Sequence, residues 1–258
     1  MIYEYKKDER SQLLPLADGW EETLIWTCVQ GFNGKAYADA RPGERPQSAQ
    51  FLVADFCFYV GKPQKELVMN HPASHPGDFV IMVPQTQEWS SLIEECYGKS
   101  CRKVLRYAFD KNPDVFDRNK LEDMEAGLEK GCTIEMIDQK YYEQAKKNAW
   151  SYDLCSQFDS YQDYKQHGIG AVVVKNNEIV AGASSYGVYH DGIEIEVDTR
   201  EDCRQRGYAR AVCARLIVAC LDRGLYPSWD AQNLKSVGLA KQLGYQFSHE
   251  YTAYEVNW

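Results

Sequence analysis

Acidic side chains alternate with apolar ones in the segment 192–199. The apolar set is Ile193, Ile195 and Val197, and the acidic set is Glu194, Glu196 and Asp198. A period of two is typical of a strand with one apolar and one acidic face. A carboxylate on such a face can act as a general base in a proton transfer. The alternative is a solvated acidic face that does no chemistry.

The turn that follows this strand, residues 199–209, combines small residues with cations. Gly207 and Ala209 let a ligand approach the backbone closely. Amides at a helix start are unpaired and lie at the positive end of the helix dipole. Arg204, Arg206 and Arg210 add positive side chains to the same turn. The turn therefore predicts an anion site, most often one for phosphate.

Both groups of residues depend on a strand–loop–helix unit for their positions. Small and apolar residues fill the segment 210–223, as expected for a helix that is buried over much of its surface. Gly224 is placed to end that helix. The strand would carry the carboxylates, and the helix start would carry the amides.

The turn carries a recognisable motif, and a second motif follows it. The run Arg204-Gln205-Arg206-Gly207-Tyr208-Ala209 resembles the (Gln/Arg)-x-x-Gly-x-(Gly/Ala) signature of the GNAT superfamily of acyl-CoA-dependent N-acyltransferases. The segment from Asn233 to Tyr245 resembles the second helix of that superfamily, with an Asn start, a small residue three positions later and a closing Leu-Gly-aromatic. Together the two motifs are fairly specific.

Two other interpretations of the first motif stay open. One is an ordinary strand–turn–helix with a glycine at its corner. The other is a dinucleotide-binding turn of the Rossmann type, which normally carries Gly-x-Gly-x-x-Gly. The run 204–209 lacks that pattern, which argues against the dinucleotide site.

The resemblance implies acetyl-CoA as cosubstrate and a set of residues that hold it. Its pantetheine arm would pair like an extra strand with the backbone near Val197, Asp198 and Thr199. Its pyrophosphate would lie on the amides of residues 205–209, beside the arginines of the motif. Asn233 matches a family position at the start of the second helix, and it could equally serve there as an N-cap. No metal is implied.

The implied reaction is direct attack of a neutral amine on the thioester. It requires a base for the ammonium proton and dipoles for the tetrahedral oxyanion. Glu194 and Glu196 are the candidates for the base. Glu194 is the first choice, because Glu196 lies next to Val197, where pantetheine should run.

One position departs from the family pattern. Many family members carry a tyrosine, the acid for the departing thiolate, seven residues after the helix-start asparagine, and this chain has Ala240 there. Departure as thiolate near helix dipoles would still be possible. The absence of the usual tyrosine at position 240 motivates a second hypothesis, a non-catalytic module that binds or senses acyl-CoA.

Within the superfamily, the chain resembles the group that contains the zwittermicin A resistance acetyltransferase. The resemblance rests on a larger N-terminal domain followed by Arg-x-x-Gly-x-Ala and Asn-x-x-Ser-x-x-Leu-Ala. No acceptor is carried over from that group.

Composition narrows the class of partner. The net charge of −9 argues against nucleic acid or an anionic membrane and is compatible with a small amine acceptor. Nine cysteines without a repeated Cys-x-x-Cys spacing and without a preceding signal peptide suggest the reducing cytoplasm. No window reaches the ~18 uninterrupted apolar residues of a membrane span. The oligomeric state is left open.

Residues 1–131 are expected to form a separate N-terminal mixed α/β domain of unassigned role. Helices are predicted around residues 20–28, 89–97 and 121–128, and strands over 51–60, 79–83 and 104–109. His71 and His75 have a spacing that could bind a metal on a helix. The prolines at 72 and 76 favour a solvated loop instead.

Residues 132–258 are expected to form the acetyltransferase domain. Strands are predicted over 133–137, 169–174, 179–188, 193–199, 226–230 and 247–256, and helices over 139–150, 159–166, 210–223 and from 233. The resulting order, β-α-α-β-β-β-α-β-α-β, resembles the GNAT fold. The fold class is therefore α/β with a mixed sheet (α+β mixed sheet).

Overall fold

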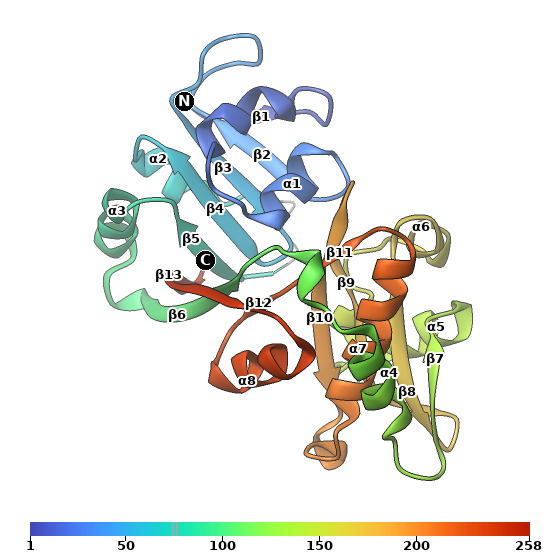
Figure 1. Ribbon diagram of the computed structural model, residues 1–258. Coiled ribbons are helices and arrows are strands. Elements are labelled where there is room, and N and C mark those ends of the chain that lie inside the picture. Colours follow the sequence, from blue (N-terminus) through green and yellow to red (C-terminus); the bar gives the residue numbers. More distant parts are fainter. Residues whose placement is uncertain (74, 76) are drawn as a thin grey trace. The chain divides into compact units, whose positions relative to one another are not determined.

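The chain folds into two compact units. The computed structural model describes residues 1–258 except 74 and 76 (Figure 1). The first unit comprises Met1–Arg106 together with Glu250–Trp258, and the second comprises Tyr107–His249.

The division between the units lies before the boundary expected after residue 131. Helix α4 (Arg118–Ala126) belongs to the second unit because its buried Leu121 joins the core around helix α7 (Tyr208–Asp222). Residues 250–258 belong to the first unit because strand β13 (Phe247–Asn257) pairs with β5 (Phe79–Pro84). The second unit therefore starts earlier and ends earlier than the expected acetyltransferase domain.

The first unit alternates short strands with helices. Its elements in chain order are β1 (Tyr3–Tyr5), the 3₁₀ helix η1 (Arg10–Ala17), α1 (Thr23–Val29), β2 (Lys35–Ala38), β3 (Ser48–Val53), β4 (Phe56–Gly61), α2 (Lys65–Val68), β5, α3 (Gln87–Tyr97), η2 (Gly98–Ser100) and β6 (Cys101–Phe109), which continues into the second unit. The sheet order is β1-β2-β3-β4-β5-β13-β6. β4 and β5 are parallel, whereas β1 to β4 pair antiparallel in sequence.

One face of this sheet is closed by helix α3. Its apolar stripe, Trp89 and Ile93, is fully buried against Met82 of β5 and Tyr254 of β13. The predicted strand 51–60 is wrong in one respect, because the structure has two strands there. Ala54, with φ +52°, makes the tight turn between them.

The second unit contains the predicted order of elements with one difference: the single strand expected over 226–230 is divided after Ser228, and its two parts pair in different sheets. The elements are η3 (Pro113–Val115), α4, β7 (Cys132–Met136), α5 (Gln139–Lys147), η4 (Tyr152–Leu154), α6 (Tyr161–His167), β8 (Gly170–Lys175), β9 (Glu178–Tyr189), β10 (Gly192–Thr199), η5 (Glu201–Cys203), α7, β11 (Tyr226–Ser228), β12 (Asp230–Ala231), α8 (Leu234–Leu243) and the start of β13. The sheet order is β11-β10-β9-β8-β7, with β10 and β11 parallel. The α/β fold class with mixed sheets is confirmed.

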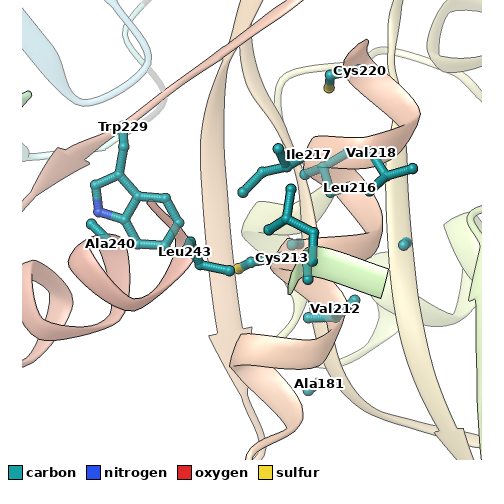
Figure 2. Close-up of a cluster of buried hydrophobic side chains, with 14 of the residues drawn as sticks. Ala181, Val212, Cys213, Leu216, Ile217, Val218, Cys220, Trp229, Ala240 and Leu243 are labelled. Atoms are coloured by element: carbon teal, nitrogen blue, oxygen red, sulfur yellow. The ribbon is translucent and has the colours of Figure 1, made fainter. Parts of the chain in front are cut away.

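The second unit has three layers. Helix α7 packs on one face of the five-stranded sheet and also contacts α4 (Figure 1). Its side chains Val212, Leu216 and Ile217 are completely buried (Figure 2). Helices α5 and α6 cover the other face, where Val172 and Val174 of β8 point. β10 therefore packs its apolar face, Ile193, Ile195 and Val197, against the α7 core, and its acidic face lies on the other side of the sheet.

Candidate active site

Strands β10 and β11 form a fork in the second unit. They pair in parallel over three positions, ending with Glu194 opposite Ser228. The chain then leaves β10 at Trp229 and pairs as β12 with the 107–108 end of β6. β10 continues alone on that side to Thr199. Beyond Glu194, β10 therefore has no neighbouring strand on that side among the described residues, and an extended ligand could pair there like a strand.

The fork coincides with an irregularity in the sheet. Between β9 and β10 the register shifts at the step from Glu194 to Ile195. Gly187 and Ser185 are the partners on β9, so Tyr186 is the extra residue. A bulge of this kind bends the strand locally and redirects side chains.

Glu194 is surrounded by hydroxyl groups at the fork. Residues that pair across a sheet have side chains on the same face, so Ser228 lies on the face of Glu194. The hydroxyl of Tyr189 lies 2.9 Å from Ser228 Oγ. Only 8% of Glu194 is exposed, and Tyr189 and Ser228 are buried too. The fork thus has a nearly buried carboxylate beside a phenol and a serine.

Gly192 makes this arrangement possible. A Cβ there would lie 2.2 Å from the carbonyl oxygen of Tyr226 and 2.5 Å from the hydroxyl of Tyr189. The absence of a side chain lets the Tyr189 ring pass over the strand and reach Ser228. Burial raises the pKa of Tyr189, and the negative charge of Glu194 raises it further. The hydroxyl of Tyr189 therefore stays protonated at neutral pH.

The other acidic residues of β10 lie further along the same face. Glu196 and Asp198 are partly exposed, and they point away from the α7 core. Burial raises the pKa of Asp198, as does the carboxylate of Asp153 in η4, while the Thr199 amide donates to Asp198 Oδ1 at 2.7 Å. This carboxylate is therefore partly committed to the local backbone.

The turn before α7 has the shape of an anion cradle. Gln205 and Gly207 both have positive φ, +62° and +80°. α7 is 15 residues long, and no side chain caps its N-terminus. A Cβ on Gly207 would meet only the Arg210 guanidinium, at 3.8 Å. The first amides of the helix thus face open space, as a bound anion requires.

The side chains of the motif point in different directions. Arg204 Nε donates to the Thr199 carbonyl at 3.3 Å, so it braces the end of β10. The side chain of Tyr208 is buried, and its hydroxyl donates to Glu129 Oε1 at 2.6 Å. Of Tyr208, only the backbone is placed to contact a ligand at the turn. Ala209 is half-buried and adds no bulk.

Glu129 binds several groups behind the turn. Its carboxylate also accepts a hydrogen bond from Lys175, and Arg206 Nη1 lies 3.7 Å from Glu129 Oε1. The hydrogen bonds from Lys175 and Tyr208 lower the pKa of Glu129 to about 2. Glu129 therefore anchors the turn as a permanent anion at neutral pH.

The strand end contains an unpaired polar atom. Thr199 Oγ1 is buried and has no hydrogen-bond partner among the described residues. A buried polar group without a partner is costly, so such an atom calls for a partner that the chain does not supply. Val197, two residues earlier, keeps its side chain on the α7 side. Only its backbone is directed to the fork.

Asn233 is the N-cap of α8. Its Oδ1 accepts hydrogen bonds from the backbone amides of Lys235 and Ser236, both at 3.0 Å. The predicted capping role is confirmed, and the side-chain NH₂ of Asn233 projects from the opposite end of the amide. A cofactor contact at this residue stays a prediction.

Ala240 lies in the core rather than at an open site. Figure 2 shows it beside the indole of Trp229 and close to Leu243. Ala240 is completely buried, and Trp229 Nε1 donates to Ser236 Oγ at 3.2 Å. The indole is thus fixed in the space that a larger side chain at 240 would need.

Three residues of this site were not found by sequence reasoning. Ser228 and Tyr189 carry no motif, and only the strand register brings them to Glu194. Glu129 stands in a charged run before β7 and looks like a solvated residue in the sequence. The positive charge of Arg206 in the signature was a hint that a carboxylate such as that of Glu129 lies near it.

The histidine pair belongs to the first unit. The expected loop 71–77 includes residues 74 and 76, which lie outside the described residues. His71 stacks on Trp258 with ring centroids 4.6 Å apart, and its Nε2 lies 2.5 Å from the Tyr97 hydroxyl. The described residues contain no group of three or more side chains that could hold a metal ion.

A family model described as GNAT acetyltransferase matches residues 14–254. The chain belongs to this family. The match includes most of the first unit as well as the second. A GNAT protein is an acetyltransferase by family, so the fork and the turn described above are the expected places for its chemistry.

Relatives and solved structures agree with the GNAT assignment. A GCN5-related N-acetyltransferase-like protein from Streptococcus suis 89/1591 is 41% identical, with a TM-score of 0.89 over 97% of this chain and 100% of that chain. The uncharacterized N-acetyltransferase YdfB of Bacillus subtilis (strain 168) is 28% identical over 169 residues. That match covers 64% of this chain and 62% of YdfB, so this chain spans less than two thirds of that relative.

A more distant GNAT structure shares the fold alone. It is a tandem GNAT protein from the clavulanic acid biosynthesis pathway, 8% identical, with a TM-score of 0.60 over 99% of this chain and 98% of that chain. Among the described residues of this GNAT protein, no helix combines the length and apolarity needed to cross a membrane.

Proposed function

We propose that this protein is an N-acetyltransferase that moves an acetyl group from acetyl-CoA to a primary amine of a small molecule. The observation that carries the proposal is the fork at Glu194 and Ser228, which opens toward an uncapped helix start at Gly207. A thioester held along β10 and a phosphate held at α7 would require these two features together.

Several residues fit acetyl-CoA. The open amides of residues 205–209 suit the pyrophosphate, and the exposed Arg206 adds positive charge. The free edge of β10 over 197–199 suits the amide groups of pantetheine, and the unpaired Thr199 Oγ1 offers one further hydrogen bond. Asn233 keeps its NH₂ for a carbonyl on the same ligand.

The chemistry needs a base and fixed dipoles. Glu194 takes the proton of the acceptor ammonium, directly or through one water. The amine nitrogen then bonds to the acyl carbon, the C–S bond breaks as CoA leaves as thiolate, and the remaining excess proton on the nitrogen passes through water to the thiolate or to solvent. Backbone amides at the bulge and the hydroxyls of Tyr189 and Ser228 are placed to stabilise developing negative charge. No metal takes part.

The second candidate function is a non-catalytic module that binds or senses acyl-CoA. The buried Ala240 favours it, because the position of the usual acid is closed by Trp229. The nearly buried Glu194 beside two hydroxyl groups favours the enzyme instead, because a sensor has no need of a buried carboxylate.

Release of free thiol from acetyl-CoA across a panel of small amines tests the proposal. The wild-type protein should release thiol in an amine-dependent manner, and Gly207→Glu should abolish it by placing a negative charge at the amide cradle. Acetyl-CoA binding without amine-dependent thiol release for any amine of the panel would favour the sensing module.

Finer assignments belong to the same proposal. We place the protein in the cytoplasm because its nine cysteines show no repeated spacing, and we expect no nucleic-acid or membrane partner because of its charge of −9. Membership of the group of the zwittermicin A resistance acetyltransferase stays a prediction. The functional division at residues 1–131 and 132–258 also stays a prediction.

A further inference from the structure

The two units repeat one order of elements. Apart from the short elements η2, η4, η5 and β12, each copy runs strand, two helical segments, three strands, helix, strand, helix, strand, and the closing strand of the second copy, β13, lies mostly within the first unit. In the first unit these are β1, η1, α1, β2 to β4, α2, β5, α3 and β6; in the second they are β7, α5, α6, β8 to β10, α7, β11, α8 and β13. In both units the fourth and fifth strands of this order, β4 with β5 and β10 with β11, form the parallel pair.

The fork differs between the two copies. In the second unit β10 continues for five residues, Ile195–Thr199, beyond its last pair with β11. In the first unit the pairing of β4 with β5 continues to Tyr59 opposite Pro84, near the end of β4. Gln85 then extends it, since its amide donates to the Tyr59 carbonyl at 3.1 Å.

Side chains of the first unit close the remaining gap. Gln85 Oε1 accepts from the Gly61 amide at 2.9 Å, and Trp89 Nε1 donates to the Gly61 carbonyl at 2.9 Å. Trp89 is completely buried. The backbone groups that an extended ligand would use are therefore already bonded, and the space is filled.

The described residues of the first unit also contain no counterpart of the turn at 204–209. β4 connects to α2 through residues 62–64, Lys-Pro-Gln, and α2 is only four residues long. The corresponding connection in the second unit is residues 200–207, followed by the long helix α7. A helix of one turn has almost no dipole to offer an anion.

We infer that the first unit is a second copy of the acyltransferase fold whose cofactor cleft is closed by Gln85 and Trp89, so that each chain binds one CoA, at the 204–209 turn. The inference rests on the proposed function for the second unit. It assigns the first unit a structural rather than a catalytic role.

Titration calorimetry of the full chain with CoA tests this inference. We expect one CoA per chain, no binding to Gly207→Glu, and unchanged affinity in Lys62→Glu. The last variant places the same charge in the equivalent connection of the first unit, where Lys62 is exposed. Hydrogen exchange provides a readout that needs no variant: CoA should protect amides within 197–209 and none within 56–64.

Each outcome has a distinct meaning. Two CoA molecules per chain, binding that persists in folded Gly207→Glu, or protection within 56–64 would overturn the closed cleft while leaving the proposed function standing. The absence of any CoA binding to the wild-type protein would instead overturn the proposed function itself. Circular dichroism checks that each variant is folded. If Gly207→Glu is not folded, hydrogen exchange on the wild-type protein decides whether CoA binds at 197–209 alone.

Discussion

The hydroxyl of Tyr189 reaches Ser228 Oγ at 2.9 Å across a residue without a side chain, Gly192. This contact joins β9 to β11 over the strand between them and places both hydroxyls beside Glu194. The fork and its buried carboxylate therefore depend on one glycine.

Gly192→Ala should destabilise the protein. The added Cβ would overlap the Tyr226 carbonyl oxygen and the Tyr189 hydroxyl, so the strands must shift. We expect a loss of about 3 kcal/mol in the free energy of unfolding, at the upper end for overpacking. Denaturant unfolding measures it. Gly127→Ala is the control, since its φ is −76° and its Cβ would make only ordinary contacts at 3.6 Å. Equal stability of the two variants would contradict the close approach.

Glu194→Gln should remove the base while keeping size and hydrogen bonding. The rate should fall by about 10²-fold or more, and the acidic limb of the pH–rate profile should flatten. CoA affinity should hardly change. Glu196→Gln is the matched control. If Glu196→Gln abolishes that limb and Glu194→Gln does not, the roles are exchanged; if neither does, both carboxylates belong to a solvated face.

Glu129→Gln should lower stability in a pH-dependent way. Hydrogen bonds from Lys175 and Tyr208 lower the pKa of Glu129 in the folded protein to about 2, from 4.5. A lowered folded pKa stabilises the fold above the unfolded pKa, and this stabilisation disappears as pH falls toward 2. The Tm difference from wild type should therefore be full at pH 7 and shrink between pH 4.5 and 2.

Glu125→Gln is the comparison for this experiment. Its carboxylate lies 3.9 Å from Arg215 Nε, so it makes a longer and weaker ion pair, and its side chain is no more exposed than that of Glu129. A Tm loss at pH 7 as large in Glu125→Gln as in Glu129→Gln would argue against a special role for Glu129.

Ala240→Tyr should not restore an acid but should destabilise α8. The buried site beside Trp229 has no room for a phenol, and overpacking of this kind costs about 1–3 kcal/mol. Gly238→Ala in the same helix is the control. A Cβ there meets nothing within 4 Å, so we expect a gain of about 0.5–1 kcal/mol. A faster, fully stable Ala240→Tyr protein would show that the position opens to the reaction.

The sequence by itself determined the local parts of this site. The alternation over 193–198 predicts β10, the apolar run over 210–223 predicts α7, and Asn233 predicts the cap of α8; all three are found. These features are encoded within a few neighbouring residues, by side-chain period and by side-chain-to-backbone bonding. The boundary expected after residue 131 and the single strand expected over 51–60 depend on packing partners. The structure divides the compact units before Tyr107 and has two strands, β3 and β4, in place of the single one.

Only the tertiary structure decided which distant residues meet. Tyr189 and Ser228 are 39 residues apart, and Tyr208 and Glu129 are 79 apart. Strand register places the first pair together, and the packing of α7 over the sheet places the second. The closed fork of the first unit likewise depends on the pairing of β4 with β5 and on the buried indole of Trp89. Such contacts follow from the summed burial of whole elements, which no short stretch of sequence encodes.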